Sequence, residues 1–316
     1  MEYTEIAGYR DVSRLGFGCW ATGGHGWGNI DDHDPIAAVE CAFDRGITFY
    51  DTADVYGFGK SEERLYRALG NHRNKVVIAT KFGVRWDDSG KTWKDISPSY
   101  MRKALEASLR RLKLDCIPIY YIHWPDGKTD LVDILQAMEG CMQEGKIGAI
   151  GISNFSTEQI KEAVEFAPIH GFQTRLNLLE RTAIYDTLPL CRANNIAFIS
   201  WGSLADGLLT GKFLKESTFS DNDHRSRNPH FQELQFLLNL EKVEKLKKLA
   251  SAINVSSAQL ALRWLLDTTG VGSVLVGAKS PIQIEENIGA LDWRLSDSEY
   301  DQLNTLTVED APATTC

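Results

Sequence analysis

The sequence lacks the features that direct a chain to a membrane or to a nucleic acid. No apolar stretch approaches the roughly 18 residues that a membrane-spanning helix needs, and residues 1–6 show neither the basic nor the apolar region of a signal peptide. The net charge is −9, the pI is about 5.3, and basic residues nowhere form a long run. A phosphate backbone attracts positive charge and this chain is acidic, so we do not expect a nucleic acid as a partner. Because no apolar stretch could span a bilayer, we do not expect a membrane as a partner either.

Cysteine and histidine are present but not in the spacings that bind metals. The six cysteines, at positions 19, 41, 116, 141, 191 and 316, include no C-x-x-C pair, and the histidines show no H-x-H spacing. Disulfide frameworks are typical of short secreted chains, and zinc sites are typical of closely spaced Cys and His. We therefore predict no bound metal, and we expect reduced thiols in a cytoplasmic protein.

Short apolar runs recur along the chain, each bounded by Gly, Asp or Asn. Most of them lack a polar/apolar alternation, which is typical of strands buried on both faces of a parallel sheet. The eight runs are Leu15–Gly18, Ile47–Tyr50, Val76–Ala79, Ile117–Ile122, Ile147–Ile152, Phe172–Thr174, Ile196–Ser200 and Val271–Val276.

Segments with helical spacing separate these runs. Ser97 can cap a helix whose first residue is Pro98, and residues 156–159 (STEQ) have the spacing of a capping box. Further helices are expected at Asp130–Met142, Ser156–Phe166, Phe231–Ala252, Ser257–Leu266 and Pro281–Leu291.

The alternation of strands and helices predicts an α/β fold, and eight strands favour a closed (β/α)8 TIM barrel over an open sheet. An open dinucleotide-binding sheet should show G-x-G-x-x-G/A after its first strand. Residues 16–21 match that pattern by letter, but the glycine-rich residues 22–28 cannot open a helix, so we reject the match. No linker rich in Pro, Gly or Ser interrupts the chain, and we expect one domain over residues 1–316.

Polar residues follow several of the predicted strands, at the ends where a (β/α)8 barrel carries its chemistry. Asp51 follows the second strand, Lys81 the third and His123 the fourth. The others are Ser153, Asn154, Gln173 and Trp201. Singly, each has an ordinary explanation: Asp51 could cap a turn, Lys81 could extend to solvent, and His123 could be a core histidine. Together they form a titratable cluster at one mouth of the barrel.

Tyr56 lies in the turn-rich segment that follows Asp51. A tyrosine with a pKa of about 10 is a poor acid or base at neutral pH. A nearby Lys81 ammonium favours tyrosinate and is expected to lower that pKa, while Asp51 keeps the lysine charged. His123 can add a hydrogen bond that positions a carbonyl oxygen. This set suits hydride transfer to a carbonyl, with Tyr56 donating the proton.

Several motifs around these residues resemble those of the aldo-keto reductases, over almost the whole chain. They are Phe49–Tyr56 (FYDTADVY), Thr80–Lys81, Tyr121–Trp124 (YIHW), Gly151–Phe155 (GISNF), Leu204–Lys212 (LADGLLTGK), Gly277–Ser280 (GAKS) and Glu286–Asn287. The resemblance implies a (β/α)8 barrel and a catalytic tetrad, which matches Asp51, Tyr56, Lys81 and His123.

The resemblance further implies NADPH extended across the barrel mouth. Positions that match contacts to the nicotinamide are Ser153, Asn154, Gln173 and the aromatic Trp201. Positions that match the pyrophosphate loop are Ser203, Leu204, Gly207 and Leu209. Lys279 and Ser280, beside Gly277, match contacts to the 2′-phosphate, and Glu286 and Asn287 match contacts to the adenine. Gln283 stands where many members have an arginine, so NADPH is favoured over NADH only moderately and NADH stays possible.

Three tryptophans are candidates for the substrate pocket. Trp20, Trp86 and Trp124 lie on segments expected at the barrel mouth, where they would surround a carbonyl substrate with aromatic walls. The polar segment 219–228, with Arg225 and Arg227, is either a solvated loop or a lid over the cofactor.

The favoured function is therefore reduction of an aldehyde, ketone or sugar carbonyl, with a small-molecule carbonyl or alcohol as the partner. An alternative is a regulatory subunit that keeps the barrel and the cofactor but has little turnover. A metal hydrolase is disfavoured because the histidines lack ligand spacing. The sequence leaves the physiological substrate, the working direction and the oligomeric state open.

Overall fold

The computed structural model describes residues 1–24, 26–27 and 33–306 of the chain. Within these ranges, eight parallel strands close into a barrel in the order in which they occur along the chain. The strands are β3 (Leu15–Gly18), β4 (Phe49–Asp51), β5 (Val77–Phe82), β8 (Ile117–Ile122), β9 (Ile147–Ser153), β10 (Gly171–Arg175), β11 (Ala197–Trp201) and β12 (Val271–Val276). Each overlaps one predicted run, so the predicted (β/α)8 barrel is confirmed.

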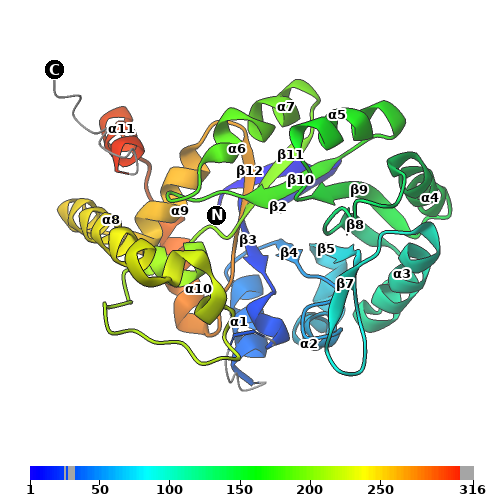
Figure 1. Cartoon of the computed structure of the whole chain (residues 1–316), viewed down its shortest axis with the longest axis horizontal. Helices are drawn as coiled ribbons and strands as arrows, with labels where there is room; N and C mark the ends of the chain where they lie inside the picture. The colour runs from blue at the N-terminus through cyan, green and yellow to red at the C-terminus, as the bar shows by residue number, and fades with distance from the viewer. Residues whose placement is uncertain (25, 28–32, 307–316) are drawn as a thin grey trace.

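Helices surround the barrel (Figure 1). They are α1 (His33–Asp44), α2 (Lys60–Leu69), α3 (Pro98–Leu112), α4 (Leu131–Gln143), α5 (Thr157–Phe166), α6 (Thr182–Tyr185), α7 (Thr187–Ala193), α8 (Glu233–Ala252), α9 (Ser257–Asp267), α10 (Pro281–Ile288) and α11 (Asp297–Thr305). The predicted caps are confirmed: Ser97 accepts a hydrogen bond from the backbone of Tyr100, and Ser156 and Gln159 form a capping box. No helix in the described ranges has the length and apolar content to cross a membrane.

Two antiparallel hairpins, which the sequence did not predict, complete the fold. Strands β1 (Tyr3–Ile6) and β2 (Tyr9–Ser13) pair with each other, and their buried residues Ile6 and Val12 pack with the inward-facing side chains of the barrel. Strands β6 (Val84–Trp86) and β7 (Thr92–Lys94) form the second hairpin, which directly follows β5. Both hairpins are short and partly exposed, so they lack the long apolar runs that marked the barrel strands.

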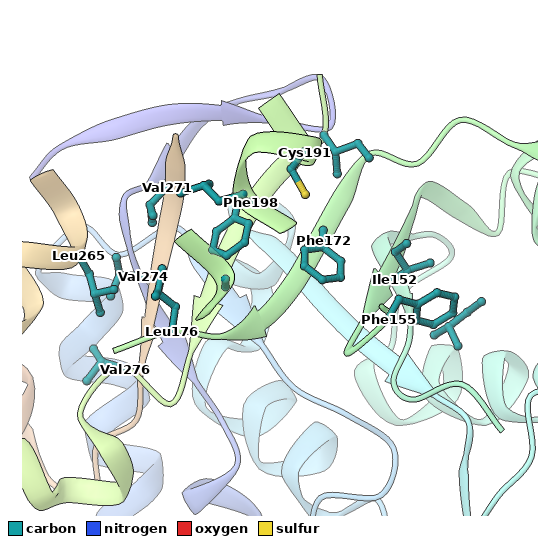
Figure 2. Close-up of a cluster of buried hydrophobic side chains, with 14 of the residues drawn as sticks. Ile152, Phe155, Phe172, Leu176, Cys191, Phe198, Leu265, Val271, Val274 and Val276 are labelled. Atoms are coloured by element: carbon teal, nitrogen blue, oxygen red, sulfur yellow. The ribbon is translucent and has the colours of Figure 1, made fainter. Parts of the chain in front are cut away.

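Side chains alternate between the outside and the inside of the barrel along each strand, as the pleat requires. Outward-facing residues pack against helices: Phe172, Phe198 and Val274 come from neighbouring strands and belong to the same buried cluster as Leu265 of α9 (Figure 2). The inward-facing residues form a separate cluster, which includes Phe49, Val77, Ala79, Ile119, Tyr121, Ala149, Ile199 and Leu275.

Large and small residues complement each other inside the barrel. The Tyr121 ring occupies space that a side chain at Gly151 or Gly171 would need: a Cβ at Gly171 would lie 2.5 Å from the Tyr121 hydroxyl oxygen. Likewise, a Cβ at Gly16 would lie 2.8 Å from the ring of Phe49. The interior is therefore a packed core, and open space begins only where the strands end.

The turn that carries Tyr56 is held by a close approach of two backbone segments. Gly57 has a φ of +61°, and a Cβ there would collide with the carbonyl oxygen of Gly23. A Cβ at Gly23 would in turn lie 2.7 Å from the carbonyl carbon of Tyr56. Only glycine meets both demands at these positions, so the pair sets the position of the Tyr56 turn against the loop that follows β3.

Replacing Gly57 should therefore destabilise the protein by more than the cost of a positive φ alone. We expect Gly57→Ala to lower the free energy of unfolding by about 3 kcal/mol or more, because positive-φ strain and a backbone collision act together. Gly127 is the matched control: its φ is +68°, but a Cβ there would meet nothing within 4 Å. Gly127→Ala should cost only about 1 kcal/mol. Equal losses of the two variants in urea unfolding would contradict the collision.

Candidate active site

The predicted catalytic residues stand on the inward-facing positions at the C-terminal ends of the strands. Asp51 lies two residues after the interior Phe49, and Lys81 lies two residues after Ala79. His123 similarly follows the interior Tyr121. Because side chains two residues apart share a face of a strand, all three point to the same space above the packed core.

Asp51, Lys81, Tyr56 and His123 meet at this point. The Lys81 Nζ donates hydrogen bonds to Asp51 Oδ1 at 2.5 Å and to the carbonyl oxygen of Thr52 at 2.8 Å. It also lies 5.1 Å from the centre of the Tyr56 ring. The Tyr56 and His123 rings meet edge to face with their centres 5.6 Å apart. Asp51, Lys81 and His123 are at least nine-tenths buried, whereas Tyr56 keeps some exposure to the cavity described below.

Burial, and not the neighbouring lysine, decides the protonation of Tyr56. Its pKa is raised above the ordinary value by burial, while the Lys81 ammonium acts in the opposite direction but does not compensate. The expectation that Lys81 lowers this pKa was therefore wrong in its net result. Burial also acts to lower the pKa of Lys81, but Asp51 and Tyr56 together outweigh burial and hold that pKa above the ordinary value. The site thus combines a protonated phenol with a charged lysine.

His123 is held in its neutral form. Burial lowers its pKa well below the ordinary value, and the positive charges of Lys81 and Lys94 act in the same direction. Its backbone carbonyl oxygen accepts a hydrogen bond from Asn154, at 3.0 Å. The ring atom Nδ1 is buried and has no hydrogen-bond partner among the described residues.

Gln173 belongs to the same network, in a way that the sequence did not predict. Its Nε2 donates a hydrogen bond to Asp51 Oδ2 at 2.5 Å, so both carboxylate oxygens of Asp51 are engaged. Gln173 was expected to contact the nicotinamide carboxamide, and it does line the cavity together with Ser153 and Asn154. The amide of Gln173 thus also holds Asp51 in place for Lys81.

A cavity of about 720 Å³ extends from these residues across the mouth of the barrel. The predicted residues that line it are Asp51, Tyr56, Lys81, His123, Ser153, Asn154, Gln173, Trp201, Ser203, Leu204, Gly207, Gly277, Lys279, Gln283, Glu286, Asn287, Trp20 and Trp124. Three predicted residues are absent from the lining. Leu209 is buried in the hydrophobic core, Ser280 stands at the N-terminus of α10, and Trp86 packs against Phe58 with ring centres 5.7 Å apart.

One part of the cavity, called its remote end because no hydrogen bond or ion pair among the described residues links its cations to the Tyr56 cluster, carries three cationic side chains. Lys212, Arg225 and Lys279 line it, although only Lys279 was predicted from the sequence to contact the cofactor. The Lys279 Nζ donates to the carbonyl oxygen of Trp27 at 3.0 Å, and Arg225 is paired with Asp223. Burial lowers the pKa of Lys279, and the charge of Arg225 lowers it further. Closely placed cations of this kind suit an anionic ligand.

The segment 219–228, predicted as either a loop or a lid, contacts the loop that follows β3. The ring of His224 lies 4.6 Å from that of Trp20 and 4.4 Å from that of Trp27, and its Nδ1 lies 2.8 Å from the carbonyl oxygen of Gly26. Asp206 anchors the other side, since it accepts a hydrogen bond from Asn228 at 2.6 Å. These contacts hold the segment along one edge of the cavity, as a lid would require. Its role as a lid stays a prediction.

Several lining residues that the sequence did not predict lie outside the eight barrel strands. Trp27, Phe58, Val84, Thr92, Lys212 and Arg225 all line the cavity. Lys212 lies inside one of the motifs, and Arg225 is part of a recognised polar segment, so their positions in the sequence were noted without their role. Strand periodicity cannot locate loop residues, because loops carry no regular alternation.

Comparisons with known proteins agree with the observed fold. The chain is 35% identical to the aldo-keto reductase yakc of Schizosaccharomyces pombe, whose name specifies NADP(+), over 95% of this chain and 90% of that protein. It is 33% identical to the NADH-specific methylglyoxal reductase of Escherichia coli, over 91% of this chain and 92% of that protein. The structure of a glycerol dehydrogenase from Gluconobacter oxydans matches with a TM-score of 0.89 and 38% identity, covering 99% of this chain and 98% of that one.

A family model confirms the resemblance seen in the motifs. The model of the aldo/keto reductase family matches residues 14–307, which include all the barrel strands. Since the match spans nearly the whole chain and the relatives are covered over most of their length, the chain belongs to the aldo/keto reductase family.

Proposed function

We propose that the protein is a carbonyl reductase that transfers a hydride between NADPH and an aldehyde, ketone or sugar carbonyl. The observation that carries this proposal is the buried Asp51–Lys81 ion pair next to the Tyr56 ring, at one end of a cavity of about 720 Å³. A cavity of this size is typical of sites for small molecules and cofactors.

Each of the four residues has a role that its environment supports. Hydride addition turns a carbonyl oxygen into an alkoxide, which needs a proton donor beside it. When bound, the nicotinamide supplies the hydride. Tyr56, which burial keeps protonated, donates the proton, and Lys81, kept charged by Asp51, stabilises the tyrosinate that remains. His123, which burial keeps neutral, lines the cavity and offers a ring hydrogen bond to the carbonyl oxygen.

The remote end of the cavity fits the phosphates of NADPH. Of its three cations, only Arg225 has a carboxylate partner among the described residues, so Lys212 and Lys279 keep positive charge for a ligand. Gln283 adds no charge, because its side-chain amide is neutral, and its Oε1 accepts a hydrogen bond from the backbone of Lys279 at 2.7 Å. We infer that these lysines offset the missing arginine and that NADPH is preferred. NADH remains a weaker alternative, and one relative is named NADH-specific.

Removing the Tyr56 hydroxyl should abolish turnover without loss of the cofactor. We expect Tyr56→Phe to lower kcat for carbonyl reduction at least about 100-fold, because the alkoxide then lacks its proton donor. The dissociation constant for NADPH, measured by fluorescence titration, should stay near that of the wild type. Tyr120→Phe is the matched control, since the Tyr120 hydroxyl is also buried but its ring packs outward against Phe82.

Two outcomes would contradict the assigned role of Tyr56. Unchanged turnover in Tyr56→Phe would exclude it as the proton donor, and lost NADPH binding would indicate a structural role. If the wild-type protein bound NADPH but reduced no carbonyl in a broad panel, a regulatory subunit would describe its function better than a reductase.

Charge at the remote end of the cavity should discriminate between the two nicotinamide cofactors. We expect Lys279→Gln to raise the dissociation constant for NADPH about tenfold, because a charge-assisted hydrogen bond to the 2′-phosphate is lost. NADH lacks this phosphate, so its dissociation constant should change much less. Lys215→Gln, at an exposed position outside the cavity lining, is the control for lost charge. Equal weakening of NADPH and NADH would place Lys279 elsewhere than at the 2′-phosphate.

A further inference from the structure

The hairpin β6–β7 forms part of the cavity wall near His123 and Trp124. Its register pairs Val84 with Lys94 and Trp86 with Thr92. Directly paired residues place their side chains on the same face of a hairpin, and Val84 and Thr92 both line the cavity. Lys94 therefore extends from the face that is turned towards the cavity, although the residue is exposed and stands outside the lining itself.

Lys94 lies close to the centre where the carbonyl would react. Its Nζ lies 4.9 Å from the centre of the Trp124 ring, and Trp124 lines the cavity beside His123. The charge of Lys94 helps to lower the pKa of the His123 imidazole. Its effect ranks third, after burial and the charge of Lys81. The ammonium group is thus stacked over one wall of the pocket, within electrostatic reach of its reactive end.

The positive charge of Lys94 is not neutralised by a neighbour. No carboxylate oxygen in the described ranges lies within 4.0 Å of its Nζ. Arg85 of β6 faces away and is paired with Asp95 at 2.9 Å. Asp126, which follows Trp124 closely, already accepts hydrogen bonds from Ile96, Lys128 and Thr129. An anion at the pocket entrance would therefore meet one free ammonium group.

We propose that Lys94 is a specificity-determining residue that favours carbonyl substrates carrying an anionic group, a carboxylate or a phosphate, at the end remote from the carbonyl. This inference rests on the proposed reductase function. Trp20 and Trp124 contact the body of such a substrate, while Lys94 pairs with its anionic end at the entrance. Because the ammonium group is exposed and carried on a flexible stem, the selectivity that it provides is moderate.

Three aldehydes that share one ring test this proposal. They are para-formylbenzoate, para-formylphenyl phosphate and the neutral para-formylbenzamide, each assayed by NADPH oxidation. We expect the wild type to show a higher kcat/KM for at least one anion than for the amide, and the preferred anion identifies the group that Lys94 recognises. Lys94→Gln should lower that ratio about three- to fivefold, and Lys94→Glu should lower it further. Added salt should reduce the ratio in the wild type but not in Lys94→Gln.

Lys91→Gln is the matched control, since Lys91 is exposed on the same hairpin, between β6 and β7, and the variant removes the same charge. Its ratio should equal that of the wild type. Equal ratios in wild type and Lys94→Gln, or the same fall in Lys91→Gln, would overturn the proposal. Affinities of the three aldehydes for the NADP⁺-loaded protein, measured by calorimetry, give the same comparison without turnover. Absence of turnover with retained anion preference would therefore refute the reductase function alone.

Discussion

Closure of the barrel sends alternate residues of every strand into one narrow interior, and most of the site follows from this constraint. Over most of each strand the inward positions must fill space, and Tyr121 does so against glycines 151 and 171. Where the strands end, the packing demand ends as well. The next inward positions carry Asp51, Lys81 and His123, so side chains far apart in the sequence come together.

Charge is balanced differently at the two ends of the cavity. At the barrel mouth, the positive charge of Lys81 is balanced by Asp51, whose second oxygen accepts a hydrogen bond from Gln173. This satisfied, buried pair allows a lysine to stay charged beside a protonated Tyr56, the combination that the proposed proton donor needs. At the remote end, Lys212 and Lys279 lack carboxylate partners among the described residues, and that excess of charge suits an anionic cofactor.

The walls of the cavity come from loops that differ in origin but pack together. The loop after β3 carries Trp20 and Trp27, and segment 219–228 reaches it through His224. The hairpin β6–β7 adds a third wall, with Val84 and Thr92 on its inner face. The barrel thus supplies the residues of the proposed chemistry, whereas these loops determine which molecules can reach them. The proposed role of Lys94 belongs to this selection of substrates.

The sequence by itself determined the barrel, because strands buried on both faces are continuous apolar runs, and parallel closure brings their carboxyl ends to one mouth. That geometry also predicts that Asp51, Lys81 and His123 cluster at this mouth. The two hairpins, the partner of Gln173, the contact of His224 with Trp27 and the raised pKa of Tyr56 were decided only by tertiary structure. Burial and loop contacts depend on which distant segments pack together, and loops have no period from which that packing can be read.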